Sequence, residues 1–407
     1  MKFSLILVGG HNFAFRWLGD DTLAAGGKAQ SGTQHESEKE ELLRRFLHNP
    51  TLSRIARKGQ AAYVSVMSNY VTDVAIIGAG PSGLFMVFEA GFLGYKTVVL
   101  DALPQIGGQL AALYPEKPIY DVPGHPHILA GDLVKNLEAQ AAPYNPTYLL
   151  GEPVERMDET DGVFTLHTAS HSVQAKAIVI AGGGGMFTPR KPTQLENLTE
   201  YEAGGSVRYA ITRKHELAEK DVVLAGGGDS AVDWAVELAH IANHVHVVHR
   251  RNDFRAAEAT VAEMMMLAQT GKITLHTPFQ LDGLSGENGQ LREVRLADLD
   301  GTTRSVSASQ LVCCFGLAPN SGPLSEWGLG LEKGVIPVNR STMTTQRAGV
   351  LCIGDMASYE GKVALILTGF AEAAVAAKAV QAHINPERKY RVQYSTSKGV
   401  PGTPGVA

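Results

Sequence analysis

Val74-Ala-Ile-Ile-Gly78-Ala-Gly80-Pro-Ser-Gly83 is the stretch that decides the fold of this chain. An apolar run over residues 74–77 ends in a Gly-x-Gly-x-x-Gly pattern, and a helical pattern over residues 81–92 follows. A second apolar run, residues 97–100, then ends at Asp101. The order strand, glycine turn, helix and strand predicts a βαβ unit that binds a dinucleotide, with Asp101 bonded to a ribose hydroxyl.

Each glycine of this pattern has its own expected role. Gly78 permits the tight turn, Gly80 lets a pyrophosphate approach the backbone, and Gly83 allows the helix to pack closely on the strand. The helix N-terminus adds amide donors and the positive end of its dipole. A glycine turn without a ligand is the alternative, and the acidic residue at the end of the second strand argues against it.

A second, looser glycine pattern closes the apolar run of residues 222–224. It reads Gly226-Gly-Gly228-Asp229-Ser230-Ala231, with a helix expected over residues 230–241 and a strand over 244–249. His249-Arg250-Arg251 stands at the end of that strand, where an acid would favour NAD. Paired arginines can hold a 2′-phosphate, so we expect NADPH, with help from Arg255. The alternative is a solvated basic turn.

Length, composition and cysteines limit the class of protein. The chain has 407 residues, which favours two domains, and 44% hydrophobic with 19% charged residues is typical of a globular protein. A net charge of −5 argues against nucleic acid as the main partner. The three cysteines lie in apolar runs, and we expect them to be buried and reduced. We therefore expect a cytoplasmic protein with no membrane span and no metal site.

The remaining elements are predicted more coarsely. We expect residues 1–70 to be a disordered N-terminal extension and residues 104–126 to be a loop that contains Gly107-Gly108-Gln109 without helix. Further helices are expected over residues 131–142 and 363–384, and a linker over 189–192. Further strands are expected over residues 154–157, 163–167, 172–175, 177–181, 311–315 and 350–353. Gly354-Asp355 follows the last strand, where Asp355 could bind a ribityl chain or cap a helix.

These motifs resemble the two-dinucleotide flavoproteins that include thioredoxin reductase. Members of that group carry Cys-x-x-Cys before the second glycine pattern, but the corresponding residues here, about 206–219, contain no cysteine. The chain is therefore similar to the thioredoxin-reductase-like ferredoxin–NADP reductases. The matching stretches include Gln109-Leu-Ala-Ala-Leu-Tyr114-Pro-Glu-Lys117, Tyr120-Asp-Val-Pro-Gly124, His249-Arg-Arg-Asn-Asp-Phe-Arg-Ala256, Tyr359-Glu-Gly-Lys362 and Ser395-Thr-Ser397.

The resemblance implies an α/β fold with two Rossmann-like (three-layer ββα) dinucleotide-binding domains. The FAD domain would be discontinuous, over residues 71–188 and 318–407, and the NADPH domain would be inserted over residues 189–317. It also implies a homodimer. Residues 1–66 lie outside the resemblance.

The resemblance also implies roles for individual residues. Tyr114 would stack on one face of the flavin, Tyr394 on the other, and Ser395 would lie near flavin N5. Because Tyr394 would block the face that the nicotinamide needs, we expect the tail or the NADPH domain to move. The expected FAD residues are Gly78, Gly80, Pro81, Ser82, Gly83, Asp101, Gly108, Gln109, Tyr114, Val154, Ala181, Gly182, Phe187, Gly354, Asp355 and Thr396. The expected NADPH residues are Gly226, Gly228, Asp229, Ser230, His249, Arg250, Arg251 and Arg255.

The activity implied is electron transfer between NADPH and ferredoxin or flavodoxin. A hydride would pass between nicotinamide C4 and FAD N5, and single electrons would pass to the carrier, with no redox-active dithiol and no acid–base residue. Two alternatives remain open. One is an NADPH-dependent quinone reductase of the diaphorase type, and the other is a flavoprotein that senses NADPH without catalysis.

Overall fold

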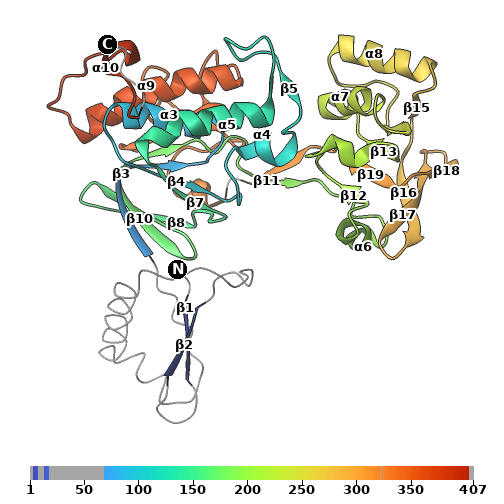
Figure 1. Ribbon diagram of the computed structural model, residues 1–407, viewed down its shortest axis with the longest axis horizontal. Coiled ribbons are helices and arrows are strands. Elements are labelled where there is room, and N and C mark those ends of the chain that lie inside the picture. Colours follow the sequence, from blue (N-terminus) through green and yellow to red (C-terminus); the bar gives the residue numbers. More distant parts are fainter. Residues whose placement is uncertain (1–2, 8–12, 18–67, 321, 403–407) are drawn as a thin grey trace. The chain divides into compact units, whose positions relative to one another are not determined.

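The computed structural model describes residues 3–7, 13–17, 68–320 and 322–402 (Figure 1). The chain divides into two compact units, Met1–Tyr70 with His167–Ser172, and Val71–Leu166 with Val173–Ala407. In the first unit, β1 (Phe3–Leu7) and β2 (Phe13–Trp17) form an antiparallel pair. The rest of the extension expected over residues 1–70 lies outside the described residues, apart from the start of β3 at Ser68.

The predicted βαβ unit opens the second compact unit. It consists of β3 (Ser68–Ile77), α3 (Pro81–Phe92) and β4 (Thr97–Asp101), and β3 and β4 pair in parallel with Val74 opposite Thr97. The strand β3 begins six residues before the expected start, because only residues 74–76 within it are consecutively apolar and buried. A third parallel strand, β7 (Thr147–Leu150), pairs with β4.

The same sheet continues on the other side of β3, in the order β7-β4-β3-β10-β9-β8. Its further strands are β8 (Arg156–Thr160), β9 (Val163–His167) and β10 (His171–Ile180). We predicted two strands where β10 runs unbroken, because the alternating first half and the apolar second half have different patterns. Much later in the chain, β22 (Val350–Cys352) pairs in parallel with β10.

Helices α3, α5 (Ala130–Ala141) and α9 (Ile366–Ile384) pack beside one another on this sheet (Figure 1). Phe85 of α3 meets Phe370 of α9 with 5.2 Å between the ring centroids. The small side chains of α9, among them Ala373 and Ala377, are fully buried in the core that Val74 and Ile76 share. Their size allows α9 to lie close to the neighbouring elements.

A second sheet is built from residues 207–313. Its order is β12 (Val207–Arg208), β19 (Gln310–Cys313), β13 (Asp221–Ala225), β14 (His244–Val248) and β15 (Ile273–His276), and the strands are parallel. Val222 and Leu224 share a core with α7 (Asp229–Leu238) and α8 (Glu258–Gln269). Val223 and Ala225 face the antiparallel strands β16 (Gln280–Glu287), β17 (Gln290–Ala297) and β18 (Thr303–Ser307). Both halves are therefore Rossmann-like α/β domains.

The two segments that connect the sheets pair with each other. They are β11 (Met186–Pro189) and β20 (Leu317–Asn320), which are antiparallel with Met186 opposite Asn320. The strand β22 follows the second sheet in the chain but pairs with β10 of the first sheet. A second domain that is inserted into the first requires the chain to return in this way. The boundaries near residues 189 and 317 stay predictions.

Short elements complete the described chain. One of them corrects the expected loop, because α4 (Gly108–Leu113) forms within it: Gln-Leu-Ala-Ala-Leu are good helix formers, and Gly107 supplies a φ of +110° at the N-cap. The others are β5 (Pro118–Ile119), β6 (Ile128–Leu129), α6 (Leu198–Ala203), β21 (Ile336–Pro337), β23 (Ala357–Ser358), α10 (Ser395–Lys398) and the 3₁₀ turns η1 (Ala142–Tyr144), η2 (Lys214–Leu217), η3 (Gly322–Glu326) and η4 (Gly354–Met356).

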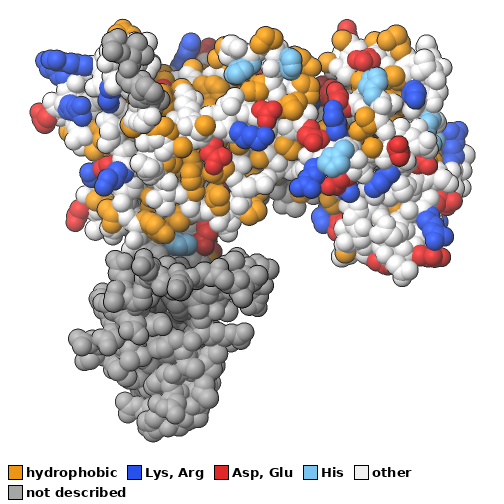
Figure 2. All heavy atoms as spheres, in the orientation of Figure 1, with side chains coloured by type: hydrophobic (Ala, Val, Ile, Leu, Met, Phe, Trp, Pro, Cys, Tyr) orange, Lys and Arg blue, Asp and Glu red, His pale blue; other side chains and the backbone are white. Residues whose placement is uncertain are grey.

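Surface charge and hydropathy add two observations. Acidic and basic side chains are interspersed on the face that Figure 2 shows, as expected for a small net charge. Among the described residues, no helix has both the length and the apolar character needed to cross a membrane.

Candidate functional site

The first glycine turn has the geometry of a phosphate-binding cradle. Gly78 has a φ of +110°, and a Cβ there would lie 2.3 Å from the carbonyl oxygen of Ala181. A Cβ at Gly83 would lie 1.9 Å from the carbonyl oxygen of Gly78, whereas one at Gly80 would meet nothing within 4 Å. Two glycines therefore permit close packing, and the third leaves open space at the N-terminus of α3, where Gly80 is the N-cap and no side chain caps the helix.

A cavity of about 390 Å³ opens beside this turn. Its walls include the glycine-containing segments that follow β3 and β10, and the turn that follows β22. The expected FAD residues that line it are Gly78, Gly80, Pro81, Ser82, Asp101, Gly108, Gln109, Tyr114, Val154, Ala181, Gly182, Gly354 and Asp355. Gly83 lies behind the turn, as its packing role requires, and Thr396 does not line the cavity. The side chain of Phe187 is outside the described part of the structure.

Asp101 ties the glycine turn to the end of β4. Its Oδ2 accepts a hydrogen bond from the backbone N–H of Ala79 at 2.6 Å, and its Oδ1 accepts one from Leu103 at 2.8 Å. Burial raises the pKa of this carboxyl group, and the two hydrogen bonds oppose that rise. Each carboxylate oxygen has a second lone pair, so Asp101 can hold the turn and still accept a ribose hydroxyl.

Gln109 and Tyr114 stand at the two ends of α4 and line two cavities, this one and a second described below. Burial raises the pKa of Tyr114, and the carboxylate of Asp355 adds to the rise. The phenol is therefore neutral at physiological pH. A half-buried aromatic ring in this position can stack on a planar ligand.

The second cavity, of about 760 Å³, opens at the second glycine turn. All the expected NADPH residues line it: Gly226, Gly228, Asp229, Ser230, His249, Arg250, Arg251 and Arg255. A Cβ at Gly226 would lie 2.6 Å from the carbonyl oxygen of Cys314, so this turn also depends on close packing. Gly228 is the N-cap of α7, again with no side-chain cap.

His249 and Arg255 help to shape this turn. The ring of His249 lies over Gly227, where a Cβ would come within 2.3 Å of it, and it stacks on Phe254 at 5.3 Å between centroids. Burial lowers the pKa of His249, and the neighbouring arginines lower it further. The backbone N–H of Arg255 donates to the carbonyl oxygen of Gly227 at 2.7 Å, which fixes the basic segment against the glycines.

Arg250 and Arg251 are exposed at the mouth of the second cavity. Within the described residues, neither side chain has an ion-pair partner. Two unpaired guanidinium groups beside a glycine turn suit a phosphate monoester, because each can donate two hydrogen bonds to it.

The C-terminal tail is where the structure differs from expectation. Tyr394 is 67% exposed, and neither it nor Ser395 or Thr396 lines the first cavity. Lys398 of α10 donates a hydrogen bond to the carbonyl oxygen of Phe92 and lies 4.6 Å from the centroid of its ring. These contacts place α10 at the C-terminal end of α3.

Sequence reasoning missed part of both cavities. Pro323, Leu324 and Trp327 line the first, together with Met356, Leu365 and Ile366. Tyr209, Trp234 and Phe279 line the second. Trp327 could have been suspected as a large apolar residue in a glycine-rich loop, but nothing in the local pattern distinguishes a cavity wall from a core residue.

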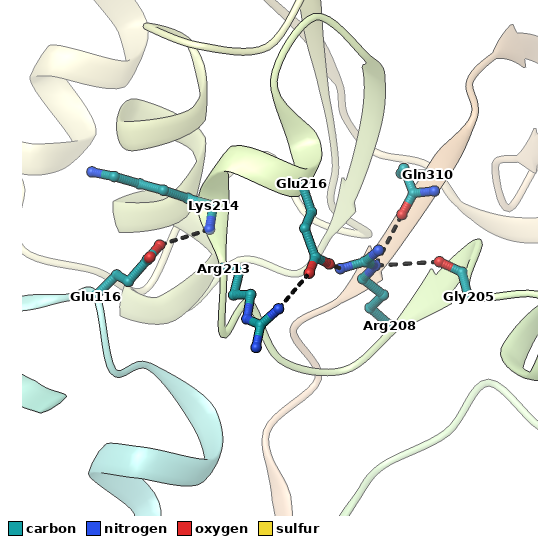
Figure 3. Close-up of polar contacts among 7 residues, drawn as sticks. All are labelled: Glu116, Gly205, Arg208, Arg213, Lys214, Glu216 and Gln310. Carbon is teal, nitrogen blue, oxygen red and sulfur yellow. Dashed lines mark hydrogen bonds and ion pairs between the residues drawn. The ribbon is translucent and has the colours of Figure 1, made fainter. Parts of the chain in front are cut away.

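The segment at about residues 206–219, which corresponds to the dithiol segment of thioredoxin reductases, carries polar side chains that bond to one another and to neighbouring elements (Figure 3). Arg208 donates to Glu216 at 2.5 Å, to Gln310 at 3.0 Å and to the carbonyl oxygen of Gly205 at 3.2 Å. The backbone N–H of Lys214 donates to Glu116 at 2.7 Å, close to Tyr114 in sequence. This segment therefore has a structural role in place of a thiol.

Comparison with known proteins points the same way. Residues 72–379 match the family described as pyridine nucleotide-disulphide oxidoreductase. The chain is 52% identical over 333 residues to the ferredoxin–NADP reductase of Acidiphilium cryptum, covering 82% of this chain and 98% of that protein. It is 49% identical to the ferredoxin–NADP reductase of Granulibacter bethesdensis, covering 81% of this chain and 95% of that protein. The crystal structure of T. acidophilum thioredoxin reductase matches with a TM-score of 0.65 at 24% identity, covering 77% and 98% of the two chains.

Proposed function

The chain belongs to the pyridine nucleotide-disulphide oxidoreductase family, among the ferredoxin–NADP reductases, and we propose that it transfers electrons between NADPH and a ferredoxin through bound FAD. The observation that carries this proposal is the shared wall of the two cavities. Gln109 and Tyr114 line both the cavity at the first glycine turn and the cavity at the second. Electrons that move between two bound cofactors need such adjacent sites.

The first cavity fits FAD. Gly80 leaves the open space that a pyrophosphate needs, Asp101 and Asp355 can bind the ribose and ribityl hydroxyls, and Tyr114 can stack on the flavin. The second cavity fits NADPH, because Arg250 and Arg251 can bind the 2′-phosphate. When bound, FAD accepts two electrons as a hydride and returns them one at a time, which couples NADPH to a one-electron carrier.

The residues of the chain bind and orient the cofactors and take no part as acids or bases. The cysteines do not supply an alternative route. Cys313 and Cys352 are buried, and burial raises the pKa of all three thiols, that of Cys314 to about 12. Thiols with raised pKa values are poor nucleophiles and poor redox centres. We therefore propose direct transfer from the flavin to the carrier.

Several finer points belong to the same proposal. The FAD domain comprises residues 71–188 and 318–407, and the NADPH domain comprises residues 189–317. The protein is a cytoplasmic homodimer, and flavodoxin is a second possible carrier. With FAD bound, the tail with Tyr394, Ser395 and Thr396 covers one face of the flavin, and the tail or the NADPH domain moves to admit the nicotinamide.

Steady-state reduction of cytochrome c by the FAD-loaded protein tests the proposal. The reaction is driven by NADPH or NADH, with and without a ferredoxin. We expect turnover to depend strongly on ferredoxin and to prefer NADPH. Turnover without ferredoxin would indicate a general NADPH-dependent quinone reductase, and slow turnover with every acceptor would favour an NADPH sensor; either result would refute the proposed carrier.

A further inference from the structure

The turn after β22 carries Asp355 into the flavin cavity. Gly354 and Met356 are buried, whereas Asp355 between them is exposed and lines the cavity. Gly354 has a φ of +72°, a left-handed conformation that glycine adopts without strain. Because glycine is also free to adopt other conformations, something outside the turn must select this one.

A buried ion pair holds both backbone polar groups of Gly354. The Oε2 of Glu372 accepts a hydrogen bond from the N–H of Gly354 at 2.7 Å. The Nζ of Lys362 donates to the carbonyl oxygen of Gly354 at 3.0 Å and also to the Oε1 of Glu372. The side chains of Lys362 and Glu372 are only 11% and 3% exposed. Rotation of either peptide plane next to Gly354 would therefore break a charge-assisted hydrogen bond.

Tyr359 completes the shell around the carboxylate. Its hydroxyl donates to the Oε1 of Glu372 at 2.7 Å. Burial, together with this hydrogen bond, raises the pKa of Tyr359 to about 12, so the phenol is a donor at any physiological pH. Both oxygens of the buried carboxylate are thus satisfied by groups that all lie within the segment 354–372.

Helix α9 brings Glu372 to the turn through a close contact at Gly369. A Cβ at Gly369 would lie 2.1 Å from the Oγ of Ser82 and 3.5 Å from the Cα of Gly354. Ser82 lies in the first turn of α3 and lines the same cavity. The absence of a side chain at Gly369 allows α9, the Gly354 turn and the start of α3 to meet, and Glu372 follows three residues later on the same helix face.

A buried ion pair is not expected to add net stability. Removing two charges from water costs about as much as their attraction returns, and apolar residues of similar volume often do as well or better. The pair is explained better by geometry than by stability. We propose that Glu372 and Lys362 are positioning residues that hold the Gly354–Asp355 turn in the conformation that binds FAD. This inference rests on the proposed function only in taking FAD as the ligand.

The decisive experiment uses a double variant, Glu372→Leu with Lys362→Met, which replaces the pair by apolar side chains. The dissociation constant for FAD is measured by flavin fluorescence on apoprotein of the full chain, and the midpoint of thermal unfolding is measured on the same apoprotein. Loss of residues that orient the ligands of a metal typically lowers metal affinity about 10–100-fold. By analogy, we expect a rise of about that size in the dissociation constant for FAD. The unfolding midpoint of the apoprotein and the affinity for NADP⁺ should stay close to those of the parent chain.

Three single variants keep the test decisive if the double variant does not fold. Glu372→Gln retains the volume and one acceptor but removes the charge that Lys362 requires, and it should weaken FAD binding. Lys362→Arg retains a cationic donor, and it should bind FAD more tightly than Lys362→Met. Lys176→Met is the matched control, because Lys176 pairs with Asp73 at 2.8 Å on the same sheet and does not line the cavity.

The outcomes separate this inference from the proposed function. A parent chain that does not bind FAD would refute the proposed function. A parent chain that binds FAD, with dissociation constants within twofold for the double variant and for Glu372→Gln, would overturn the positioning role. A double variant whose apoprotein unfolds far below the parent, with the affinity of Glu372→Gln unchanged, would assign the pair to stability instead.

Discussion

A methyl group added at Gly80 is expected to weaken FAD binding without destabilising the apoprotein. No atom lies within 4 Å of the position that a Cβ at Gly80 would take, so the apoprotein has room for the side chain. Gly80 has φ −72° and ψ −179°, which alanine adopts without strain. Alanine is a poorer N-cap than glycine, but it also lowers the entropy of the unfolded chain, and the two effects, each about 0.5–1 kcal/mol, offset each other.

The bound state has no such room if a pyrophosphate lies against the turn. Forcing a methyl group into a close-packed contact costs about 1–3 kcal/mol. Because each 1.4 kcal/mol is about a tenfold change in affinity, Gly80→Ala should raise the dissociation constant for FAD by about 5- to 150-fold.

Gly83→Ala is the matched control in the same pattern. Its Cβ would lie 1.9 Å from the carbonyl oxygen of Gly78, so the turn and α3 would have to separate by about 1.5 Å to reach ordinary contact. This clash exists with or without FAD, and it should destabilise the apoprotein by at least about 1–3 kcal/mol.

Thermal unfolding of the apoproteins and fluorescence titration with FAD distinguish the two variants. We expect Gly80→Ala to lose affinity at a nearly unchanged unfolding midpoint, and Gly83→Ala to lose several degrees in the absence of FAD. An unaltered FAD affinity for Gly80→Ala would refute the assignment of this turn to the pyrophosphate. An apoprotein of Gly80→Ala less stable than that of Gly83→Ala would refute the steric reasoning itself.

Two further predictions concern the second domain. Arg250→Ala should raise the KM for NADPH about 10- to 150-fold, because it removes charge-assisted hydrogen bonds of about 1.5–3 kcal/mol. It should leave the KM for NADH nearly unchanged. Equal effects on both cofactors, or a similar effect of the remote control Arg292→Ala, would refute the 2′-phosphate site. His246 shares a 3.1 Å hydrogen bond between its Nδ1 and the Nε2 of His276, and burial lowers its pKa from 6.5 to about 4. The unfolded chain then binds more protons between pH 6.5 and 4, so the stability due to neutral His246 is complete above pH 6.5 and is lost as the pH falls toward 4. Because the side chain is only partly buried, we expect about 1 kcal/mol, measured as a shallower dependence of the unfolding midpoint on pH in His246→Asn. Parallel profiles would contradict this expectation.

The two βαβ units could be predicted because local sequence patterns determine them. The helix α3 has the predicted bounds, and the strands β4 and β14 end within one residue of their predicted ends. Glycines at fixed spacing, short apolar strands and helix starts all lie within about 25 residues of one another, and each was visible without knowledge of the rest of the chain. The glycine turn and the basic segment in the second cavity belong to the same patterns, whereas Tyr209, Trp234 and Phe279 do not.

Elements that depend on distant contacts were harder to predict. The helix α4 has only six residues, and its formation depends on packing of Leu110 in the core with α5 more than on its own periodicity. The unbroken strand β10 was divided because its first half follows β9 in the alternating part of the sheet and its second half is buried beside β22. Neither α5 nor β22 is adjacent in sequence to the residues that it contacts.

The environment of Gly354 shows most clearly what sequence patterns cannot contain. Glu372 lies inside an alanine-rich helix, where a lone acid is ordinarily placed on the solvent side. The fold buries it, because Gly369 lets α9 touch Ser82 and the carboxylate then meets the N–H of Gly354. A buried charge needs partners, and Lys362 and Tyr359 supply them from a loop that follows the turn. This network holds the backbone next to Asp355. The conformation of the Gly354–Asp355 turn therefore depends on contacts with α9 and with the loop at Lys362, which no local motif contains.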